Sequence, residues 1–146
     1  MAVDSALPGE DEQARRFEKA RLAQAGALLE DYVELIDDLL QSGGEARPTD
    51  VARRLGVSHA TAIKSIARLK REGLATSKAY RGVFLTAAGR ALAARARARH
   101  RLVVDVLVAV GVPRACAELD AEGMEHHVSD AALEAFSRFL KSSREN

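Results

Sequence analysis

The 146-residue chain has no tryptophan, one cysteine, three prolines and only 4% aromatic residues. Because Cys116 has no second cysteine to pair with, an internal disulfide is excluded, and we expect a small packed thiol in a reducing cytoplasm. No stretch of about 18 apolar residues is present, so we expect no membrane span. The charged N-terminus also lacks the apolar segment of a secretory signal. The many alanines and few prolines favour helices.

Charge is unevenly distributed along the chain, although the net charge is only +1. The segment from Arg47 to Arg101 contains fourteen Lys and Arg and two acidic residues, a net charge of +12, and the rest of the chain carries −11. A basic segment between acidic ones indicates that one part of the protein faces a polyanion. The alternative is that solvated helix faces happen to segregate by charge.

Apolar residues between positions 24 and 41 recur at three- and four-residue spacing, which predicts an amphipathic helix that ends before Gly43 and Gly44. Residues 1 to about 22 are polar, and we expect a mobile tail or a frayed helix there.

Two short helices and a hairpin are predicted next. Thr49 or Asp50 is suited to cap a helix through Leu55, and Gly56 begins a turn. Ser58 is suited to cap a second helix that Gly73 ends. Its expected inward residues are Ala62, Ile63, Ile66 and Leu69. The following stretch LATSKAYRGVFLT predicts two strands around a tip containing Lys78, Tyr80, Arg81 and Gly82. This order of elements is typical of a winged helix-turn-helix.

The C-terminal part is predicted to be helical throughout. Thr86 precedes a long run whose first half is basic and whose second half is apolar, and the apolar half needs a partner such as a second copy of the chain. Pro113 suits the first turn of the next helix, which we expect to continue through His127. Ser129 is suited to cap a last helix. That helix has an apolar stripe of Leu133, Phe136, Phe139 and Leu140.

The basic helix-turn-helix predicts contact with double-stranded DNA. In this motif the first residues of the second helix meet base edges in the major groove, and other basic residues bind phosphates. The predicted DNA-contacting residues are Ser58, His59, Thr61, Lys64, Ser65, Arg68, Lys78 and Arg81. The alternative is a winged helix used for protein contacts. For Arg95, Arg97 and Arg99 simple solvation is the competing interpretation.

The stretch EGMEHH predicts a metal site. Glu122, Glu125 and His126 have the i, i+3, i+4 spacing of one helix face, although a solvated helix end would show the same pattern. Asp31 and Glu34 lie beside the apolar stripe of the first helix, and His100 lies where the long helix changes from basic to apolar. Four carboxylates and two imidazoles suit Mn²⁺ or Fe²⁺ better than thiolate-preferring ions. Six ligands are more than one ion needs, so two bridged ions would fit.

Several of these motifs together carry a family resemblance. DYVEL (31–35), the helix-turn-helix, YRGVFLT (80–86), ARH (98–100) and DAEGMEHH (120–127) resemble the manganese transport regulators of the diphtheria-toxin-repressor family of metal-dependent transcription factors. The resemblance covers roughly residues 25 to 140. It implies that the six metal-site positions hold a binuclear site. It also implies a homodimer whose metal-loaded form binds palindromic operators near metal transporter genes.

Comparison with that family refines the expectations. Iron-responsive relatives carry Met where Asp31 stands and Cys where Glu122 stands, so the oxygen ligands favour Mn²⁺, with Fe²⁺ left open. The expected organisation is a polar extension (1–23), a winged helix-turn-helix DNA-binding domain (24–95) and a helical metal-binding and dimerisation domain (96–146). Because the sequence stops soon after the last predicted helix, we expect no SH3-like C-terminal domain. The expected fold is therefore mainly α with a small β-hairpin wing.

Three other functions compete with a manganese-responsive repressor. A metal-independent winged-helix repressor would leave the carboxylate and histidine pattern unexplained. A dinuclear metallohydrolase would use such ligands, but no further residue is obviously placed as a general base, so we expect no enzyme. A nucleoid protein would show little operator preference. Binding of about two Mn²⁺ per chain separates the first alternative from the expected function.

Overall fold

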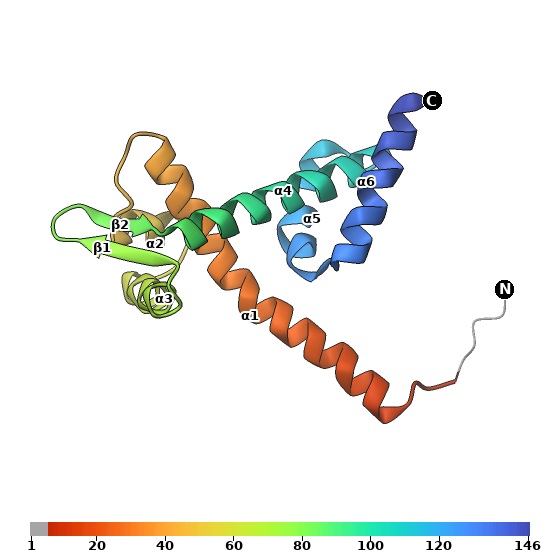
Figure 1. The fold of residues 1–146 in the computed structure, drawn as a ribbon, viewed down its shortest axis with the longest axis horizontal. Coiled ribbons are helices and arrows are strands. Elements are labelled where there is room, and N and C mark those ends of the chain that lie inside the picture. The colour runs from red at the N-terminus through yellow and green to blue at the C-terminus, as the bar shows by residue number, and fades with distance from the viewer. Residues whose placement is uncertain (1–5) are drawn as a thin grey trace.

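The fold is mainly helical, and the computed structural model describes residues 6–146 of the chain (Figure 1). The elements are α1 (Glu10–Gln41), α2 (Pro48–Leu55), α3 (His59–Arg71), β1 (Ala75–Lys78), β2 (Gly82–Leu85), α4 (Ala87–Ala109), α5 (Arg114–Met124), the 3-10 helix η1 (Glu125–His127) and α6 (Asp130–Glu145). The helices α2 and α3 and the hairpin gather at one end, α5 and α6 at the other, and α4 runs between them. The predicted class, a winged helix-turn-helix followed by helices, is confirmed.

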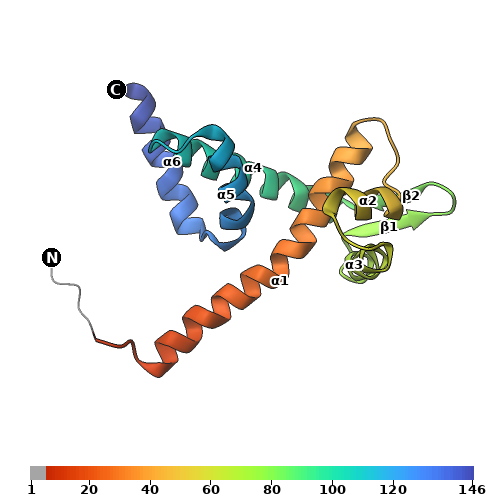
Figure 2. The same ribbon diagram turned by 180° about the vertical axis from the view of Figure 1, so that it is seen from behind.

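Helix α1 is longer than the apolar periodicity predicted. It begins at Glu10, so the helix is the correct alternative for residues 10–22, while residues 1–5 lie outside the described part of the chain. Three acidic residues in the first turn suit the positive end of the helix dipole, and Glu12 pairs with Arg16 one turn later. The first turns of α1 extend away from the other elements in both views (Figure 2), whereas Lys19 farther along reaches the backbone carbonyl of His127 at 3.3 Å.

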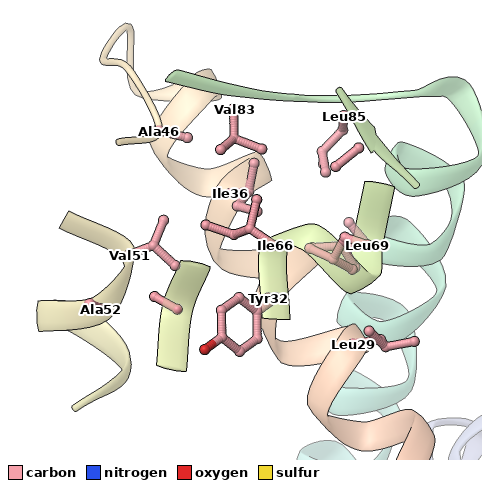
Figure 3. Close-up of a cluster of buried hydrophobic side chains, with 14 residues drawn as sticks. Leu29, Tyr32, Ile36, Ala46, Val51, Ala52, Ile66, Leu69, Val83 and Leu85 are labelled. Carbon is pink, nitrogen blue, oxygen red and sulfur yellow. The ribbon is translucent and has the colours of Figure 1, made fainter. Parts of the chain in front are cut away.

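The core of the winged helix is formed by buried side chains that point toward one another, mainly from α1, α2, α3 and β2 (Figure 3). Tyr32 and Ile36 of α1 meet Val51 of α2, Leu69 of α3 and Val83 of β2, and all five are almost fully buried. The periodicity of α1 therefore identified a helix that belongs to this core.

Three details of the helix-turn-helix test the predicted pattern. Ser58 caps α3 by accepting a hydrogen bond from the Thr61 amide, as predicted. The cap predicted at Thr49 or Asp50 is wrong, because α2 begins at Pro48, whose missing amide proton costs nothing in the first turn. The inward position predicted for Ile63 is also wrong, since Ile63 is 45% exposed.

The wing is a two-stranded antiparallel hairpin in which Ala75 pairs with Leu85 and Lys78 with Gly82. Ala46, in the segment before α2, forms a further bridge to Val83. Gly82 makes this approach possible, because it has φ +85° and an added Cβ would lie 2.6 Å from the Ala46 carbonyl oxygen. The wing is thus attached to the start of the helix-turn-helix.

Helix α4 is one continuous element that leads from the wing into the C-terminal part. Thr86 caps it by accepting from the Gly89 amide, as predicted. Near its other end, Val103 and Val104 pack with Ala117 and Ala121 of α5 in a second, smaller core. Within the described chain no helix is long and apolar enough to cross a membrane.

The surface of the C-terminal part leaves apolar side chains uncovered. Ser129 caps α6 as predicted. In the described chain α6 contributes no buried residue, so the predicted stripe that includes Phe136 and Phe139 is at least partly exposed. The packed thiol predicted at Cys116 is wrong, because Cys116 is exposed on α5.

Candidate metal centre and nucleic-acid interface

The predicted metal ligands lie on the elements that meet beside α1. Asp31 and Glu34 belong to α1, His100 to α4, Glu122 to α5, and Glu125 and His126 to η1. Two groups of three have ligand atoms within 4.8 Å of one another: Asp31 with Glu125 and His126, and His100 with Glu122 and Glu125.

Glu125 belongs to both groups. Glu34 is in neither, but it lines a shallow surface hollow together with Asp31 and Glu122. The structure therefore gathers five of the six predicted ligands into two groups that share Glu125 and places the sixth beside Asp31 and Glu122.

The turn that carries Glu125 differs from the predicted helix. We expected one helix through His127, but α5 ends at Met124 and residues Glu125–His127 form a 3-10 turn. Gly123, a weak helix former, precedes this change, and 3-10 turns are common at helix ends. As a result Glu125 is fully buried, whereas the side chain of Glu122 remains 62% exposed.

The buried carboxylate of Glu125 lacks the partners that a carboxylate needs. Neither side-chain oxygen has a hydrogen-bond partner among the described residues. They lie 3.4 Å from the Nδ1 atom of His100 and 3.4 Å from the Nε2 atom of His126. Burial, with repulsion from Glu34 and Glu122, raises the pKa of Glu125 to about 7 in spite of the two imidazoles. Unpaired buried acceptors of this kind call for a bound cation or proton.

The two imidazoles are surrounded by carboxylates. The Nε2 atom of His126 lies 3.2 Å from an Asp31 oxygen, and its Nδ1 atom lies 2.5 Å from an oxygen of Glu30. The hydrogen bond with Asp31 is the largest cause, followed by that with Glu30, and together they raise the pKa of His126 to about 10 although burial lowers it. For His100, burial lowers the pKa, but the hydrogen bond with Glu118 and the charge of Glu122 outweigh it and raise the pKa overall.

The donor set fits hard divalent cations. It offers carboxylate oxygens and imidazole nitrogens without a thiolate, and Cys116 is not part of it. Burial, and after it the charge of the nearby Glu122, raises the pKa of Glu34, so repulsion between carboxylates contributes to the shift. Divalent cations would relieve this repulsion, and their affinity would fall as protons compete for the same atoms.

Sequence reasoning missed two carboxylates beside this centre. Glu30 pairs with Arg99 and with His126, and Glu118 binds His100. Glu118 could have been found, because it lies one helical turn before Glu122. Glu30 had no local signal, since its partners are far away in the sequence.

Simple solvation was the competing interpretation for three arginines of α4, and it is wrong for Arg97 and Arg99, which form ion pairs with α1. Arg97 binds Asp37 at 3.1 Å and Asp38 at 2.6 Å, and Arg99 binds Glu30 at 2.5 Å. These ion pairs join α4 to α1 directly. Arg95 is exposed, as expected.

The exposed side of α3 and the wing hold most of the predicted DNA contacts. Ser58, His59, Thr61, Lys64, Lys78 and Arg81 are exposed. Lys78 lies over the ring of Phe84, with 5.1 Å between its ammonium nitrogen and the ring centroid.

Two of the eight predicted DNA contacts are less free. Ser65 is only 8% exposed, and Arg68 is hydrogen-bonded to Glu72. Both still line a shallow hollow with Thr61, Lys64 and Arg71. The DNA-contacting role of the eight residues stays a prediction.

Comparison with known proteins adds two family matches. Residues 26–83 match the iron dependent repressor N-terminal DNA binding domain, and residues 86–146 match the iron dependent repressor metal binding and dimerisation domain.

Individual relatives agree with these matches. Transcriptional regulator MntR of Escherichia coli O157:H7 is 48% identical over 135 residues, 92% of this chain and 87% of the relative. HTH-type transcriptional regulator MntR of Shouchella clausii (strain KSM-K16) is 33% identical over 118 residues, 81% of this chain and 82% of the relative. The solved structure of the manganese regulator SloR has a TM-score of 0.70 and 27% identity over 77% of this chain, which spans about half (53%) of that structure.

Proposed function

Because this chain belongs to the diphtheria-toxin-repressor family, whose two iron dependent repressor domains account for residues 26–83 and 86–146, we propose that it is a manganese-responsive DNA-binding repressor of metal transport genes. The relatives named MntR and the manganese regulator SloR support manganese as the signal. The domain boundaries proposed from the sequence, at residues 24 and 96, remain our own division. We propose no catalytic role.

The proposed metal ligands are Asp31, Glu34, His100, Glu122, Glu125 and His126. We propose two Mn²⁺ per subunit, because Glu125 belongs to two separate groups of potential ligands. When bound, the ions supply positive charge that offsets the mutual repulsion of the four carboxylates. The single observation that carries this assignment is the fully buried carboxylate of Glu125, which has no hydrogen-bond partner among the described residues.

The ligands connect the two parts of the subunit. Asp31 and Glu34 lie on α1, whose residues Tyr32 and Ile36 belong to the core of the winged helix. Glu122, Glu125 and His126 lie on α5 and η1 in the C-terminal part. Neutralised carboxylates allow α1 and η1 to remain close, and repelling ones favour separation. The position of the winged helix relative to the C-terminal helices therefore depends on the charge of the centre.

A homodimer formed through the C-terminal helices would present two winged helices to DNA. The partly exposed apolar stripe of α6 and the family match to a dimerisation domain support this assembly. Two recognition helices held at a fixed separation match half-sites spaced by one helical turn, about 34 Å, or a multiple of it. A change in that separation alters affinity for a palindromic operator without changing any residue in contact with DNA.

The decisive experiment measures operator affinity as a function of metal. A palindromic DNA would be selected from a random pool with the Mn²⁺-loaded protein, and then titrated at one salt concentration with and without Mn²⁺. A coupling free energy of about 1–3 kcal/mol per site predicts a change of about 5- to 150-fold. Equal affinity in the two states would contradict the proposal and favour a metal-independent repressor.

The same titration with Fe²⁺ under anaerobic conditions tests the iron-responsive alternative. Carboxylates at positions 31 and 122 offer oxygen donors that Mn²⁺ accepts readily. We therefore expect Mn²⁺ to increase affinity at lower free concentration than Fe²⁺. Stronger activation by Fe²⁺ would reassign the signal but leave the regulator and its binding site in place.

A further inference from the structure

Each imidazole of the centre is bound by a carboxylate that is not one of the six proposed ligands. The Nδ1 atom of His126 lies 2.5 Å from Glu30, and the Nε2 atom of His100 lies 2.8 Å from Glu118. In both rings the other nitrogen faces Glu125, at 3.4 Å. In His126 this nitrogen also lies 3.2 Å from Asp31, and in His100 it lies 3.7 Å from Glu122. The same arrangement thus occurs twice, with opposite ring nitrogens.

We propose that Glu30 and Glu118 are positioning residues that select the metal-facing nitrogen of each histidine, Nε2 in His126 and Nδ1 in His100. The inference rests on the proposed function, because it concerns the same metal centre. It adds two residues and a defined ring orientation that the six ligands alone do not specify.

The selection follows from the chemistry of the donors. A carboxylate ion only accepts hydrogen bonds, so the ring nitrogen that faces it must carry the proton. The second nitrogen of each ring faces carboxylates that are themselves proposed ligands. A cation bound by those carboxylates takes the place of the proton on this nitrogen, and the imidazole then offers it a lone pair while the proton facing Glu30 or Glu118 stays. Carboxylates that hold metal-binding histidines in this way fix both the tautomer and the ring orientation.

Glu30 is the more firmly held of the two. Its side chain is 15% exposed, and the oxygen that contacts His126 also forms an ion pair with Arg99 of α4 at 2.5 Å. Glu118 is about half exposed and lies near Arg114 at 3.7 Å. A buried carboxylate with a fixed position constrains its partner more strongly than a solvated one, so the larger effect is expected at Glu30.

Glutamine is the informative replacement at both positions. Its amide has nearly the same shape, but it can either accept or donate a hydrogen bond and therefore no longer selects one ring tautomer. Glu18→Gln is the matched control, because Glu18 is an exposed residue of the same helix as Glu30.

The first measurement is Mn²⁺ affinity of the full chain by calorimetry. Loss of such a positioning carboxylate typically weakens metal affinity by about 10- to 100-fold. We expect a loss in this range for Glu30→Gln, a smaller loss for Glu118→Gln and no change for Glu18→Gln. Circular dichroism establishes that each variant is folded, and Glu118→Gln keeps the test available if Glu30→Gln does not fold.

The second measurement identifies the ligating nitrogen directly. In ¹⁵N-labelled protein loaded with ¹¹³Cd²⁺, scalar coupling should appear at Nε2 of His126 and Nδ1 of His100. Glu30→Gln should weaken the coupling at His126 and preserve that at His100, which a general loss of stability would not do.

Two results would overturn the inference: coupling at the opposite ring nitrogens, or wild-type Mn²⁺ affinity in both glutamine variants. If the wild type also switches its DNA affinity with Mn²⁺, either result removes the inference alone. If the DNA affinity of the wild type does not change with Mn²⁺, the proposed function is refuted instead. If the wild type binds neither Mn²⁺ nor Cd²⁺, the proposed function and the inference are both refuted.

Discussion

Replacement of Glu125 by glutamine should stabilise the metal-free protein while abolishing its response to Mn²⁺. Glu125 is fully buried and its oxygens are unpartnered among the described residues, so its negative charge is costly without a cation. Glutamine has nearly the same shape and no charge. The substitution therefore removes the cost and the proposed shared ligand together.

The magnitude follows from the pKa of Glu125, which burial raises from 4.5 to about 7. A raised carboxyl pKa means that the native state is favoured below the unfolded value of 4.5 and loses that advantage as the pH rises through 7. The cost of the ionised group grows from about 2 kcal/mol at pH 6 to about 3 kcal/mol at pH 8, as an order of magnitude. The glutamine side chain resembles the protonated carboxyl. The metal-free Glu125→Gln protein should therefore be more stable than the wild type by about 2 kcal/mol at pH 6 and about 3 kcal/mol at pH 8.

Urea unfolding with a chelator present, at pH 6 and pH 8 and at one protein concentration, measures the effect. Glu122→Gln is the matched control, because it removes a neighbouring carboxylate that is 62% exposed, and we expect little change. Excess Mn²⁺ should then stabilise the wild type by mass action and stabilise Glu125→Gln far less. A metal-free Glu125→Gln protein that is less stable than the wild type at pH 8, or equal stabilisation by Mn²⁺, would refute the reasoning.

Three further substitutions test other parts of the molecule. Lys64→Ala removes an exposed charge of α3 and should weaken DNA binding. If Lys64 contacts a phosphate, the slope of log affinity against log salt should fall by about 1, and Mn²⁺ uptake measured by calorimetry should be unchanged. Gly82→Ala places a Cβ 2.6 Å from the Ala46 carbonyl oxygen at φ +85°, so thermal unfolding should show a loss of about 1–3 kcal/mol, and an unchanged midpoint would contradict the strain argument. Arg97→Ala leaves the largely buried Asp37 without its ion pair and should cost about 1–3 kcal/mol in urea unfolding, whereas a neutral result would mean that water replaces the guanidinium.

The sequence predicted the elements whose signals are local. Ser58, Thr86 and Ser129 were identified as helix caps, because the capping hydrogen bond reaches only three residues along the chain. The winged-helix order was predicted for the same reason. The spacing of the EGMEHH stretch predicted one helix face shared by Glu122, Glu125 and His126, but the 3-10 turn places Glu122 and His126 in two different groups of potential ligands. The inward position of Ile63 was wrong, since the spacing alone does not locate the edge of a buried helix face.

Interactions between distant segments could not be predicted. Glu30 and His126 are 96 residues apart, and Arg97 and Asp37 are 60 apart, so no spacing rule links them. The change from α5 to the 3-10 turn also depends on packing against α1, because the periodicity of the stretch fits a continuous helix equally well. Thus Glu118 was within reach of a spacing argument, whereas Glu30, the carboxylate that contacts His126, required the structure.

The continuity of α4 limits how the protein can change shape. A helix of 23 residues is about 34 Å long, and its first part is clamped to α1 by Arg97 and Arg99. A smooth bend of about 10° over this length moves the far end of the helix by about 3 Å, close to one base-pair step of about 3.4 Å. In a dimer, slight bending of the two α4 helices can therefore move the two winged helices out of register with their DNA half-sites, while every contact between α1 and α4 stays in place.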